Sequence, residues 1–406
     1  MRRTILHCDC NGFFASVECL LEPKLRLVPM AVAGDPENRH GIILAKNELA
    51  KKDGVKTAET IWQARRKCPG LVLVPPHHDL YQEYSIRVNK IYQRYTEQVE
   101  PFGIDESWLD VTGSQKLFGD GKKIADEIRA AVRQETGLTV SVGVSYNKVF
   151  AKLGSDYQKP DATTVFMPED YEQKIAPLPV SDLLYVGKAT QQTLNLIGIK
   201  TIGQLALADA GLLEQRLGKA GRMLHIYANG EDAEPVKSVY EQKQVKSVGN
   251  EITFREDLAG EEQLRPAVVL LADSVAARMR RHGFLCATVQ VTVKDSNFKT
   301  VSRQCPVQPP TDLAREISEA ALGLLKPFCH KKTPVRMLMI TGSQLILKDQ
   351  FAQQLSLFED DTKKREKISR FEETLDGLHH RFGKAAVVRA STLNKKQERG
   401  QGTNEK

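Results

Sequence analysis

The sequence predicts a multidomain α/β protein built on a mixed sheet that is covered by helices. Three observations support this fold class. Residues 4–8 form a short apolar strand, apolar residues recur at helical spacing over residues 81–99 and 122–137, and two strand-like runs, VEPFGIDESWLDVTG and LTVSVGVSYN, flank the second of these helices. Alternating strands and helices of this kind form a layered α/β sheet. The chain of 406 residues is long enough for roughly two to four domains.

The charge distribution favours a polyanionic partner. The chain has 58 Lys and Arg residues against 51 Asp and Glu residues, which gives a formal charge of +7. Residues 243–345 alone hold 15 basic and 10 acidic residues and so contribute +5 of this excess. The concentration of positive charge in one segment predicts a basic module near the C-terminal end.

The N-terminus and the cysteines predict a soluble, cytoplasmic protein without a membrane segment. The opening MRRTILHCDC has too short an apolar run for a signal peptide, and no apolar stretch reaches the ~18 residues that a transmembrane helix needs. The seven cysteines are an odd number, and the only close pair, Cys8 and Cys10, has no second pair to complete a zinc site. We therefore expect reduced thiols.

Three acidic residues stand at strand ends and predict a site for divalent cations. Asp9 ends the apolar strand in HCDCNGFFASVE, and Asp105 and Glu106 are adjacent in FGIDESWLD. Adjacent side chains of a regular strand point to opposite faces, so both acids can face one site only at a turn or strand end, which Gly103 permits. A lone acidic pair would indicate a solvated hairpin tip. With Asp9 in the same sheet, hard oxygen ligands favour magnesium, and a pair of ions ~3.5–4 Å apart is usual for nucleotidyl transfer.

These motifs resemble the palm motifs of Y-family DNA polymerases, the translesion group. HCDCNGFFASVE, FGIDESWLD and SVGVSYNKVFAKLGSDYQKPDATTV occur in the same order and at similar spacings, and the resemblance extends over about residues 1–345. It implies a low-fidelity, template-directed DNA polymerase that adds deoxynucleotides to a primer 3′ end in translesion synthesis and DNA repair. No segment remains for a proofreading exonuclease.

The resemblance implies a right-hand polymerase with a mixed-sheet palm, small fingers, a helical thumb and an α/β little finger. The glycine-containing turns of LLYVGKATQQTLNLIGIKTIGQLA resemble a helix-hairpin-helix element of the thumb, although an ordinary helical hairpin is the alternative. The expected domains are the palm at 1–11 and 76–166, fingers at 12–75, thumb at 167–235, linker at 236–243, little finger at 244–346, and a tail at 347–406.

The resemblance also implies the metal ligands. The carboxylates of Asp9, Asp105 and Glu106 would hold two magnesium ions, and the backbone carbonyl of Cys10 would join the second ion. These ions would activate the primer 3′-hydroxyl and steady the triphosphate. The acid at the end of the first strand would then be neutralised by metal.

Two further residues acquire roles toward the nucleotide. An aromatic residue at the position of Phe14 would lie under the incoming sugar and exclude a 2′-hydroxyl, whereas Phe13 would pack into the palm. Lys159, in QKPDATT, matches a lysine that contacts the triphosphate.

The segment ILAKNELAKKDGV departs from the family pattern. The family places a tyrosine and an arginine on the triphosphate where this chain has Glu48 and Lys51. Lys51 can neutralise phosphate but lacks the bidentate geometry of arginine. We expect Glu48 to turn away, with Lys46 or Asn47 supplying a replacement contact.

The thumb and the basic module supply the expected contacts with primer-template DNA. Any single basic residue there could serve solubility alone, so the candidates rest on their place in the predicted domains. They are Gly187, Lys188, Ser247, Arg278, Arg280, Lys294 and Arg303.

The tail carries a short motif, QQLSLFED, which resembles the peptide by which bacterial polymerases bind the sliding clamp. Its glutamine and apolar anchors are Gln354, Leu355, Leu357 and Phe358. Downstream, apolar residues at steps of three and four predict an amphipathic helix over residues 368–382 that packs on the body or on a partner.

Two other functions fit parts of the pattern. A nucleotidyl cyclase shares a palm-like sheet and two metals, but the thumb, basic module and clamp peptide argue against it. A catalytically inactive DNA-binding or clamp-adaptor protein is disfavoured because all three carboxylates are present. We expect a monomer that binds DNA, deoxynucleoside triphosphates and the clamp.

Overall fold

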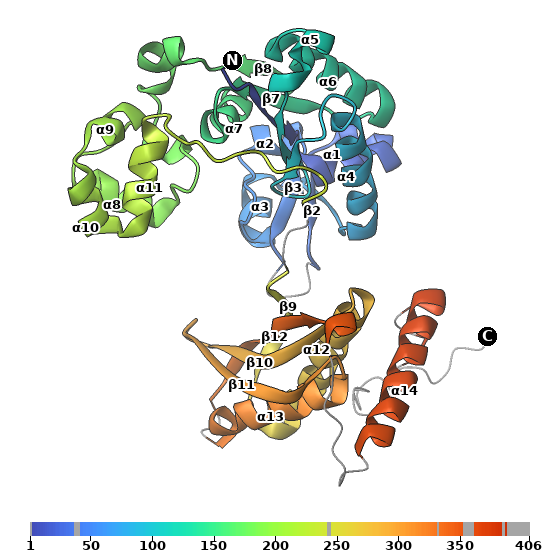
Figure 1. The fold of residues 1–406 in the computed structure, drawn as a ribbon. Helices are drawn as coiled ribbons and strands as arrows, with labels where there is room; N and C mark the ends of the chain where they lie inside the picture. Colours follow the sequence, from blue (N-terminus) through green and yellow to red (C-terminus); the bar gives the residue numbers. More distant parts are fainter. Residues whose placement is uncertain are drawn as a thin grey trace. The chain divides into compact units, whose positions relative to one another are not determined.

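The structure is a computed structural model that describes residues 2–35, 41–241, 245–330, 333–351, 361–383 and 386–387. The chain divides into two compact units, Met1–Gln242 and Lys243–Lys406 (Figure 1). In the described part of the chain, no helix is long and apolar enough to cross a membrane.

The first unit is built on a mixed sheet, as the sequence predicts, and this sheet has five strands. Strand β1 is central and pairs antiparallel with β6 and β7, while β7 and β8 are parallel. The order is β5-β6-β1-β7-β8, formed by β1 (Ile5–Cys10), β5 (Val99–Pro101), β6 (Glu106–Asp110), β7 (Val140–Ser145) and β8 (Thr163–Val165).

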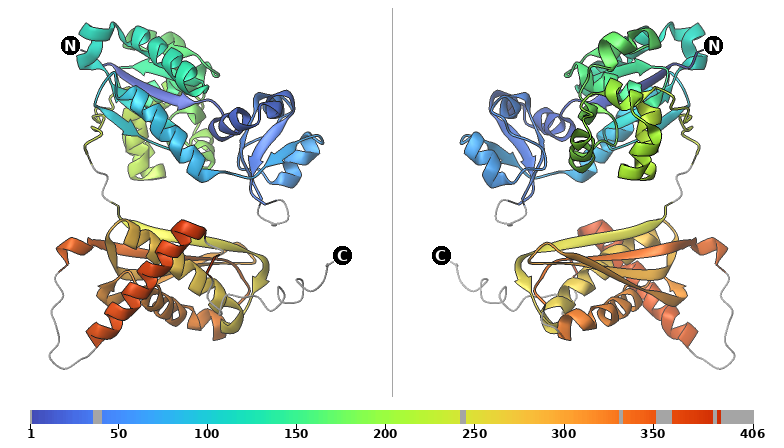
Figure 2. Two further views of the ribbon diagram at one scale, coloured as in Figure 1. Left: turned by 90° about the vertical axis from the view of Figure 1, so that its right-hand side faces the viewer. Right: turned by 90° about the vertical axis from the view of Figure 1, so that its left-hand side faces the viewer.

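Helices cover both faces of this sheet (Figures 1 and 2). Helices α4 (His78–Tyr92) and α6 (Gly121–Thr136) pack on one face, and α7 (Lys148–Tyr157) packs on the other. Gly143 in β7 allows α7 to come close, because a Cβ atom there would lie 1.9 Å from the carbonyl oxygen of Ala151.

Successive side chains of β1 point to opposite faces of the five-stranded sheet. Leu6 and Cys8 join the apolar core under α4 and α6. His7 and Asp9 point to the opposite face, toward α7. The polar residues of β1 therefore lie on the side of the sheet that α7 covers.

The predicted fingers segment has its own small sheet of order β3-β2-β4. Helix α1 follows the end of β1 directly and packs against β2 and β3. The elements are α1 (Phe13–Leu21), β2 (Met30–Ala33), β3 (Ile43–Lys46), α2 (Glu48–Lys52), α3 (Ile61–Lys67) and β4 (Val72–Val74).

Four short helices form a bundle that shares a core with α7. Phe150 and Leu153 of α7 belong to this core, so α7 lies between the sheet and the bundle. The helices are α8 (Lys188–Leu196), α9 (Ile202–Leu207), α10 (Ala210–Leu217) and α11 (Lys219–Ala228). The remaining helical turns of this unit are η1 (Pro23–Leu27), η2 (Thr112–Ser114), α5 (Gln115–Phe118), η3 (Pro168–Asp170), η4 (Tyr171–Ile175) and η5 (Val180–Asp182).

The segment after α11 runs back over the sheet. The amide of Lys237 donates to Glu100 Oε2 at 3.0 Å, and the amide of Val239 donates to the carbonyl of Glu97 at 3.0 Å. Part of the stretch that we expected to be a linker is thus attached to the first unit.

The second unit is an antiparallel sheet of order β11-β10-β12-β9. Helices α12 (Glu261–Arg281) and α13 (Ala314–His330) pack on one face and share its apolar core (Figure 2). The stretch LRPAVVLLADSVAARMRRHG in the basic module predicts α12, whereas α13 was not predicted. The strands are β9 (Ser247–Leu258), β10 (Phe284–Asp295), β11 (Thr300–Thr311) and β12 (Val335–Leu347), followed by the turn η6 (Lys348–Gln350).

A final helix, α14 (Asp361–Phe382), packs on α12 of the same unit (Figure 1). Arg280 of α12 forms ion pairs with Glu372 at 2.6 Å and Asp376 at 2.7 Å. Glu372 Oε2 also accepts a hydrogen bond from the amide of Ala314, next to the start of α13. The predicted amphipathic helix therefore packs on the body of the protein.

Candidate active site

The three predicted carboxylates meet at one end of the palm sheet, the five-stranded sheet of the first unit. Asp9 near the end of β1 pairs in register with Glu106, the first residue of β6. Asp105 precedes Glu106, and its carbonyl accepts a hydrogen bond from the amide of Cys10 at 3.0 Å. The strand-end placement that adjacent acids require is therefore present.

A tight turn between β5 and β6 produces this placement. The amides of Phe102 and Gly103 both donate to the carbonyl of Glu106, at 2.9 and 3.4 Å. The chain therefore reverses immediately before the two acids. Asp105 lies in the turn and Glu106 in the strand, so the two side chains are released from strict alternation.

Two lysines hold the carboxylates in this structure. Lys159 Nζ lies 2.7 Å from Asp9 Oδ2 and 2.8 Å from Asp156 Oδ1. Lys152 Nζ lies 2.7 Å from Glu106 Oε2 and 3.9 Å from Asp9 Oδ2. Lys159 was predicted at the site, whereas Lys152 was missed. The available signal was the four-residue spacing of Lys148, Lys152 and Asp156, which places them on one face of α7.

The environment separates the pKa values of the acids. Burial, and then repulsion from Asp9 and Glu106, raise the pKa of Asp105 to about 6. Burial also raises the pKa of Asp9 although Lys159 opposes it. Burial alone would raise the pKa of Glu106, but the contacts with His7 and Lys152 lower it to about 2. The surroundings therefore disfavour the charged form of Asp9 and Asp105 and favour the charged form of Glu106.

His7 is a second residue that the sequence analysis missed. Its ring is fully buried, Nδ1 lies 2.8 Å from Ser155 Oγ, and Nε2 lies 3.2 Å from Glu106 Oε2. Burial lowers the pKa of His7, so the ring is neutral at pH 7. His7 is two residues before Asp9 on β1, and this spacing alone indicated a shared face of the strand.

Phe14 lies in an aromatic cluster where α1 meets α4. Its ring stacks on Tyr81 at 4.1 Å between centroids, with 13° between the planes, and contacts His78 edge-on at 5.9 Å. Phe13 is 3% exposed and belongs to the apolar core of the palm. The two phenylalanines thus differ as expected: Phe13 is core, and Phe14 is partly exposed.

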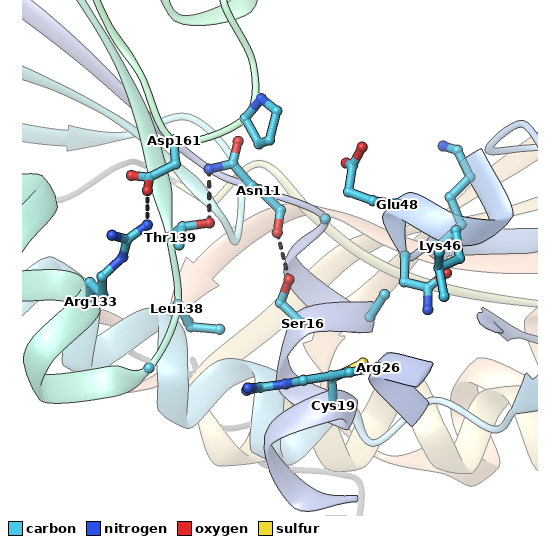
Figure 3. A pocket seen from close by; sticks show the side chains of 16 residues that line it. Asn11, Ser16, Cys19, Arg26, Lys46, Glu48, Arg133, Leu138, Thr139 and Asp161 are labelled. Carbon is cyan, nitrogen blue, oxygen red and sulfur yellow. Dashed lines mark hydrogen bonds and ion pairs between the residues drawn. The ribbon is translucent and has the colours of Figure 1, made fainter. Parts of the chain in front are cut away.

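A cavity of about 550 Å³ opens beside the end of β1, between the fingers segment and the palm (Figure 3). Arg26 and Lys46 line the fingers side, and Arg133, paired with Asp161, lines the palm side. Asn11 lies between them, where its amide donates to Thr139 Oγ1 at 3.1 Å and accepts from Ser141 at 2.8 Å. Asn11 is therefore fixed by hydrogen bonds with the palm.

The departures at residues 46–51 have a structural account. Glu48 and Lys51 lie 3.5 Å apart, and each side chain is more than half exposed. Lys46 Nζ donates to Thr57 Oγ1 at 3.0 Å. Asn47 has no donor left for a phosphate, because its side chain caps α2 and bonds to Leu25, Val28, Met30 and Ala50. Of the two replacements that we expected, only Lys46 remains.

The DNA-contact candidates have different surroundings. Gly187 is the N-cap of α8 and Lys188 is its first residue, and a Cβ atom on Gly187 would meet only open space. Ser247 and Arg303 are exposed on edge strands of the second unit, and Lys294 is partly exposed.

The two arginines of α12 have partners within the second unit. Arg278 is exposed and donates to the carbonyl of Gly249 at 2.7 Å. The side chain of Arg280 is 8% exposed and bonds to Glu372, Asp376 and the carbonyl of Asp312. Arg280 of α12 therefore holds α14 against α12. This corrects its selection as a DNA contact, because its guanidinium is bonded to Glu372, Asp376 and Asp312.

Comparisons with known proteins support one family. The impB/mucB/samB family model matches residues 8–156, and the model of its C-terminal domain matches residues 245–357. DNA polymerase IV of Acetivibrio thermocellus is 47% identical over 400 residues, which cover 98% of this chain and 99% of that protein. DNA polymerase IV 1 of Bacillus subtilis is 36% identical over 405 residues, covering 99% and 96%. A solved Y-family DNA polymerase chimera, 24% identical, covers 85% of this chain and 99% of that chain with a TM-score of 0.77.

The chain belongs to the Y-family DNA polymerases. It is a DNA-directed DNA polymerase of the translesion class, with the multidomain right-hand fold of that family.

Y-family polymerases use divalent metal ions, and the donor set of this polymerase fits such an ion. Carboxylate oxygens are hard ligands, and the raised pKa of Asp105 reflects negative charge that a cation would neutralise. As the side chains stand, no three potential ligands among the described residues are grouped closely enough to hold a metal. Lys152 and Lys159 form ion pairs with Glu106 and Asp9.

The predicted clamp peptide of the polymerase, Gln354 to Phe358, lies outside the described residues. Its role stays a prediction.

Proposed function

We propose that this polymerase extends a primer 3′ end by magnesium-dependent nucleotidyl transfer at Asp9, Asp105 and Glu106. The observation that carries the proposal is the convergence of three carboxylates at the paired ends of β1 and β6. Burial, and then repulsion from Asp9 and Glu106, raises the pKa of Asp105 to about 6. A cation is the natural partner for such a group.

The proposed ligands of two magnesium ions are the three carboxylates, with the backbone carbonyl of Cys10 as an additional oxygen. When bound, magnesium supplies charge neutralisation and activation of the attacking hydroxyl. The chain holds the ligands in place by strand pairing: Asp9 opposes Glu106, and the amide of Cys10 holds the carbonyl of Asp105. His7 and Lys152 keep Glu106 ionised.

The lysines around the site are proposed to bind the triphosphate. Lys159 already lies within 2.7 Å of Asp9 and so can contact phosphates that approach the metal ligands. Lys51 is exposed beside Glu48, and Lys46 lines the cavity at the end of β1. Lysine contributes a point charge to each phosphate contact.

Phe14 is proposed to select the sugar. Its partly exposed ring lies in the first turn of α1, just after the end of β1. Stacking on Tyr81 fixes the position of the ring. A rigid apolar ring under the sugar leaves no space for a 2′-hydroxyl.

DNA contacts are proposed at Gly187 and Lys188 in the first unit. The amides at the start of α8 and the lysine beside them suit a phosphate. In the second unit the proposed contacts are Ser247, Arg278, Lys294 and Arg303, and the clamp is proposed to bind Gln354, Leu355, Leu357 and Phe358. We propose that the enzyme acts as a monomer in the cytoplasm.

Primer extension tests this function against its alternatives. The wild-type protein is expected to add deoxynucleotides only when magnesium, a template and a primer are all present, and to extend past a damaged template base. A nucleotidyl cyclase would consume triphosphate without a primer, and an inactive adaptor would bind DNA without extension. Either result would contradict the proposal.

A further inference from the structure

Helix α1 contacts Tyr81 of the palm through two of its side chains. Phe14 and Glu18 are four residues apart and so lie on one face of α1. The Phe14 ring stacks on Tyr81, and the Tyr81 hydroxyl donates a hydrogen bond to Glu18 Oε1. The ring and the hydroxyl of one side chain are thus both held by the same helix.

The side chain of Glu18 is buried, with 2% of the residue exposed. Its hydrogen-bonding partners are Tyr81 and His77, whose Nδ1 lies 2.9 Å from Glu18 Oε1. A buried carboxylate destabilises a fold unless it is hydrogen-bonded. Tyr81 and His77 therefore supply the hydrogen bonds that this buried acid needs.

The plane of the Phe14 ring depends on its neighbours. The torsion that rotates a phenylalanine ring has a broad minimum, so the side chain alone does not fix the ring. Tyr81 supplies the stacking face and His78 supplies an edge contact. Tyr81 is itself fully buried, and its hydrogen bond to Glu18 fixes the tilt of its ring.

We propose that Glu18 is a positioning residue for sugar selection: it holds the Tyr81 hydroxyl, and Tyr81 in turn holds the ring of Phe14 beneath the sugar. This inference rests on the proposed role of Phe14. Without the hydrogen bond, the Tyr81 ring tilts, the Phe14 ring gains freedom, and a 2′-hydroxyl finds space. Glu18 itself touches no substrate.

The test compares ribonucleotide with deoxyribonucleotide incorporation in the full-length enzyme, as a ratio of kcat/KM values. Glu18→Ala and Tyr81→Phe each remove the hydrogen bond, and Tyr81→Phe keeps the stacked ring. Each is expected to raise the ratio by about five- to tenfold, on the scale of one lost hydrogen bond. Discrimination between matched and mismatched bases is expected to stay unchanged.

Two further variants separate positioning from a loss of stability. Glu18→Gln keeps an acceptor oxygen and is expected to restore the wild-type ratio. The double variant Glu18→Ala with Tyr81→Phe is expected to match the single variants, because both break one bond. Glu100→Ala, which removes another buried glutamate of the same unit, is the control, and its sugar ratio is expected to equal that of the wild type.

The outcomes distinguish this inference from the function on which it rests. If Phe14→Ala raises the ratio while Glu18→Ala and Tyr81→Phe do not, Glu18 has no positioning role and the sugar selection by Phe14 stands. If Glu100→Ala raises the ratio as much as Glu18→Ala does, general destabilisation explains the effect and the inference is overturned. If Phe14→Ala leaves the ratio unchanged, the proposed role of Phe14 fails and the inference fails with it.

Discussion

Lys148 and Glu100 form a buried ion pair in the palm. Lys148 Nζ lies 2.7 Å from Glu100 Oε2, and the two side chains are 4% and 10% exposed. Lys148 also lies over the ring of Trp108, 5.2 Å from its centroid. Because each charge is removed from water, each depends on its partner.

Lys148→Met is expected to destabilise the protein by about 3–5 kcal/mol, because it leaves Glu100 buried without its ion-pair partner. Urea denaturation of the full chain measures the loss. Arg94→Ala is the control, since Arg94 pairs with Glu135 at the surface and is expected to change the free energy of unfolding far less. Equal losses in the two variants would show that burial of the Lys148 pair has no energetic role.

The same pair predicts a pH dependence of stability. Burial alone would raise the pKa of Glu100, but hydrogen bonds from Lys148 and the amide of Lys237 lower it. Its contribution is therefore present above the unfolded carboxyl pKa of about 4.3 and is lost as pH falls through the lower folded pKa. Between those values, the free energy of unfolding of the wild type is expected to fall more steeply with decreasing pH than that of Glu100→Gln. Parallel curves would refute this assignment.

Sugar selection is the next residue-scale prediction. Phe14→Ala is expected to raise ribonucleotide incorporation far more than Phe13→Ala, because Phe14 is partly exposed near the end of β1 and Phe13 is core. Incorporation of matched ribo- and deoxynucleotides measures the effect. Equal effects of the two variants would remove Phe14 from this role.

The sequence predicted the three acids of the candidate site more fully than their partners. Asp9, Asp105 and Glu106 stand out because an acid at the end of an apolar strand is unusual. His7 and Lys152 could not be assigned in the same way, because their contacts with Glu106 arise only when α7 packs on β1. For the same reason Arg280 looked like a DNA contact: its ion pairs come from a helix some 90 residues further along the chain.

At the scale of elements, α14 is an integral part of the second unit. It contributes Glu372, which is 2% exposed, to a contact that joins Arg280 of α12 and the amide of Ala314 next to α13. Arg365 adds an ion pair with Glu316 of α13 at 2.7 Å. The helix therefore connects the two helices that cover the sheet.

Arg280→Ala is expected to lower the thermal stability of the second unit without changing how DNA affinity depends on salt, because the guanidinium has no free face for a phosphate. Arg303→Ala is expected to show the reverse: unchanged stability, and a slope of log affinity against log salt reduced by about 1. Differential scanning fluorimetry and DNA-binding titrations at several salt concentrations test both. A reduced salt slope in Arg280→Ala would restore it as a DNA contact.

Strands and helices were predicted best where the period of the apolar residues and the length of the segment indicated the same type of element. The strands β1, β6 and β7 and the helices α4, α6 and α12 follow from apolar spacing. Helix α13 was missed although it is long and its apolar residues recur at helical spacing. The register that places Asp9 opposite Glu106 depends on long-range pairing and could not be obtained from the pattern alone.

At the scale of the whole molecule, catalysis of primer extension is expected to be independent of binding to the sliding clamp. Leu357→Ala with Phe358→Ala is expected to abolish stimulation by a loaded sliding clamp, because a few apolar anchors carry most of the affinity of such peptides. Extension of a short primer without the clamp is expected to be unchanged. Stimulation equal to that of the wild type would mean that QLSLF does not bind the clamp.

The central claim is that Asp9, Asp105 and Glu106 form the metal-dependent catalytic centre of a DNA polymerase. The most direct measurement is primer extension by Asp9→Asn and Glu106→Gln in magnesium, with DNA affinity measured on the same preparations. Both variants are expected to lose extension and keep DNA binding, because each removes negative charge from the metal ligands and leaves the basic surfaces intact. Near wild-type turnover in either variant would contradict the assignment of the catalytic centre.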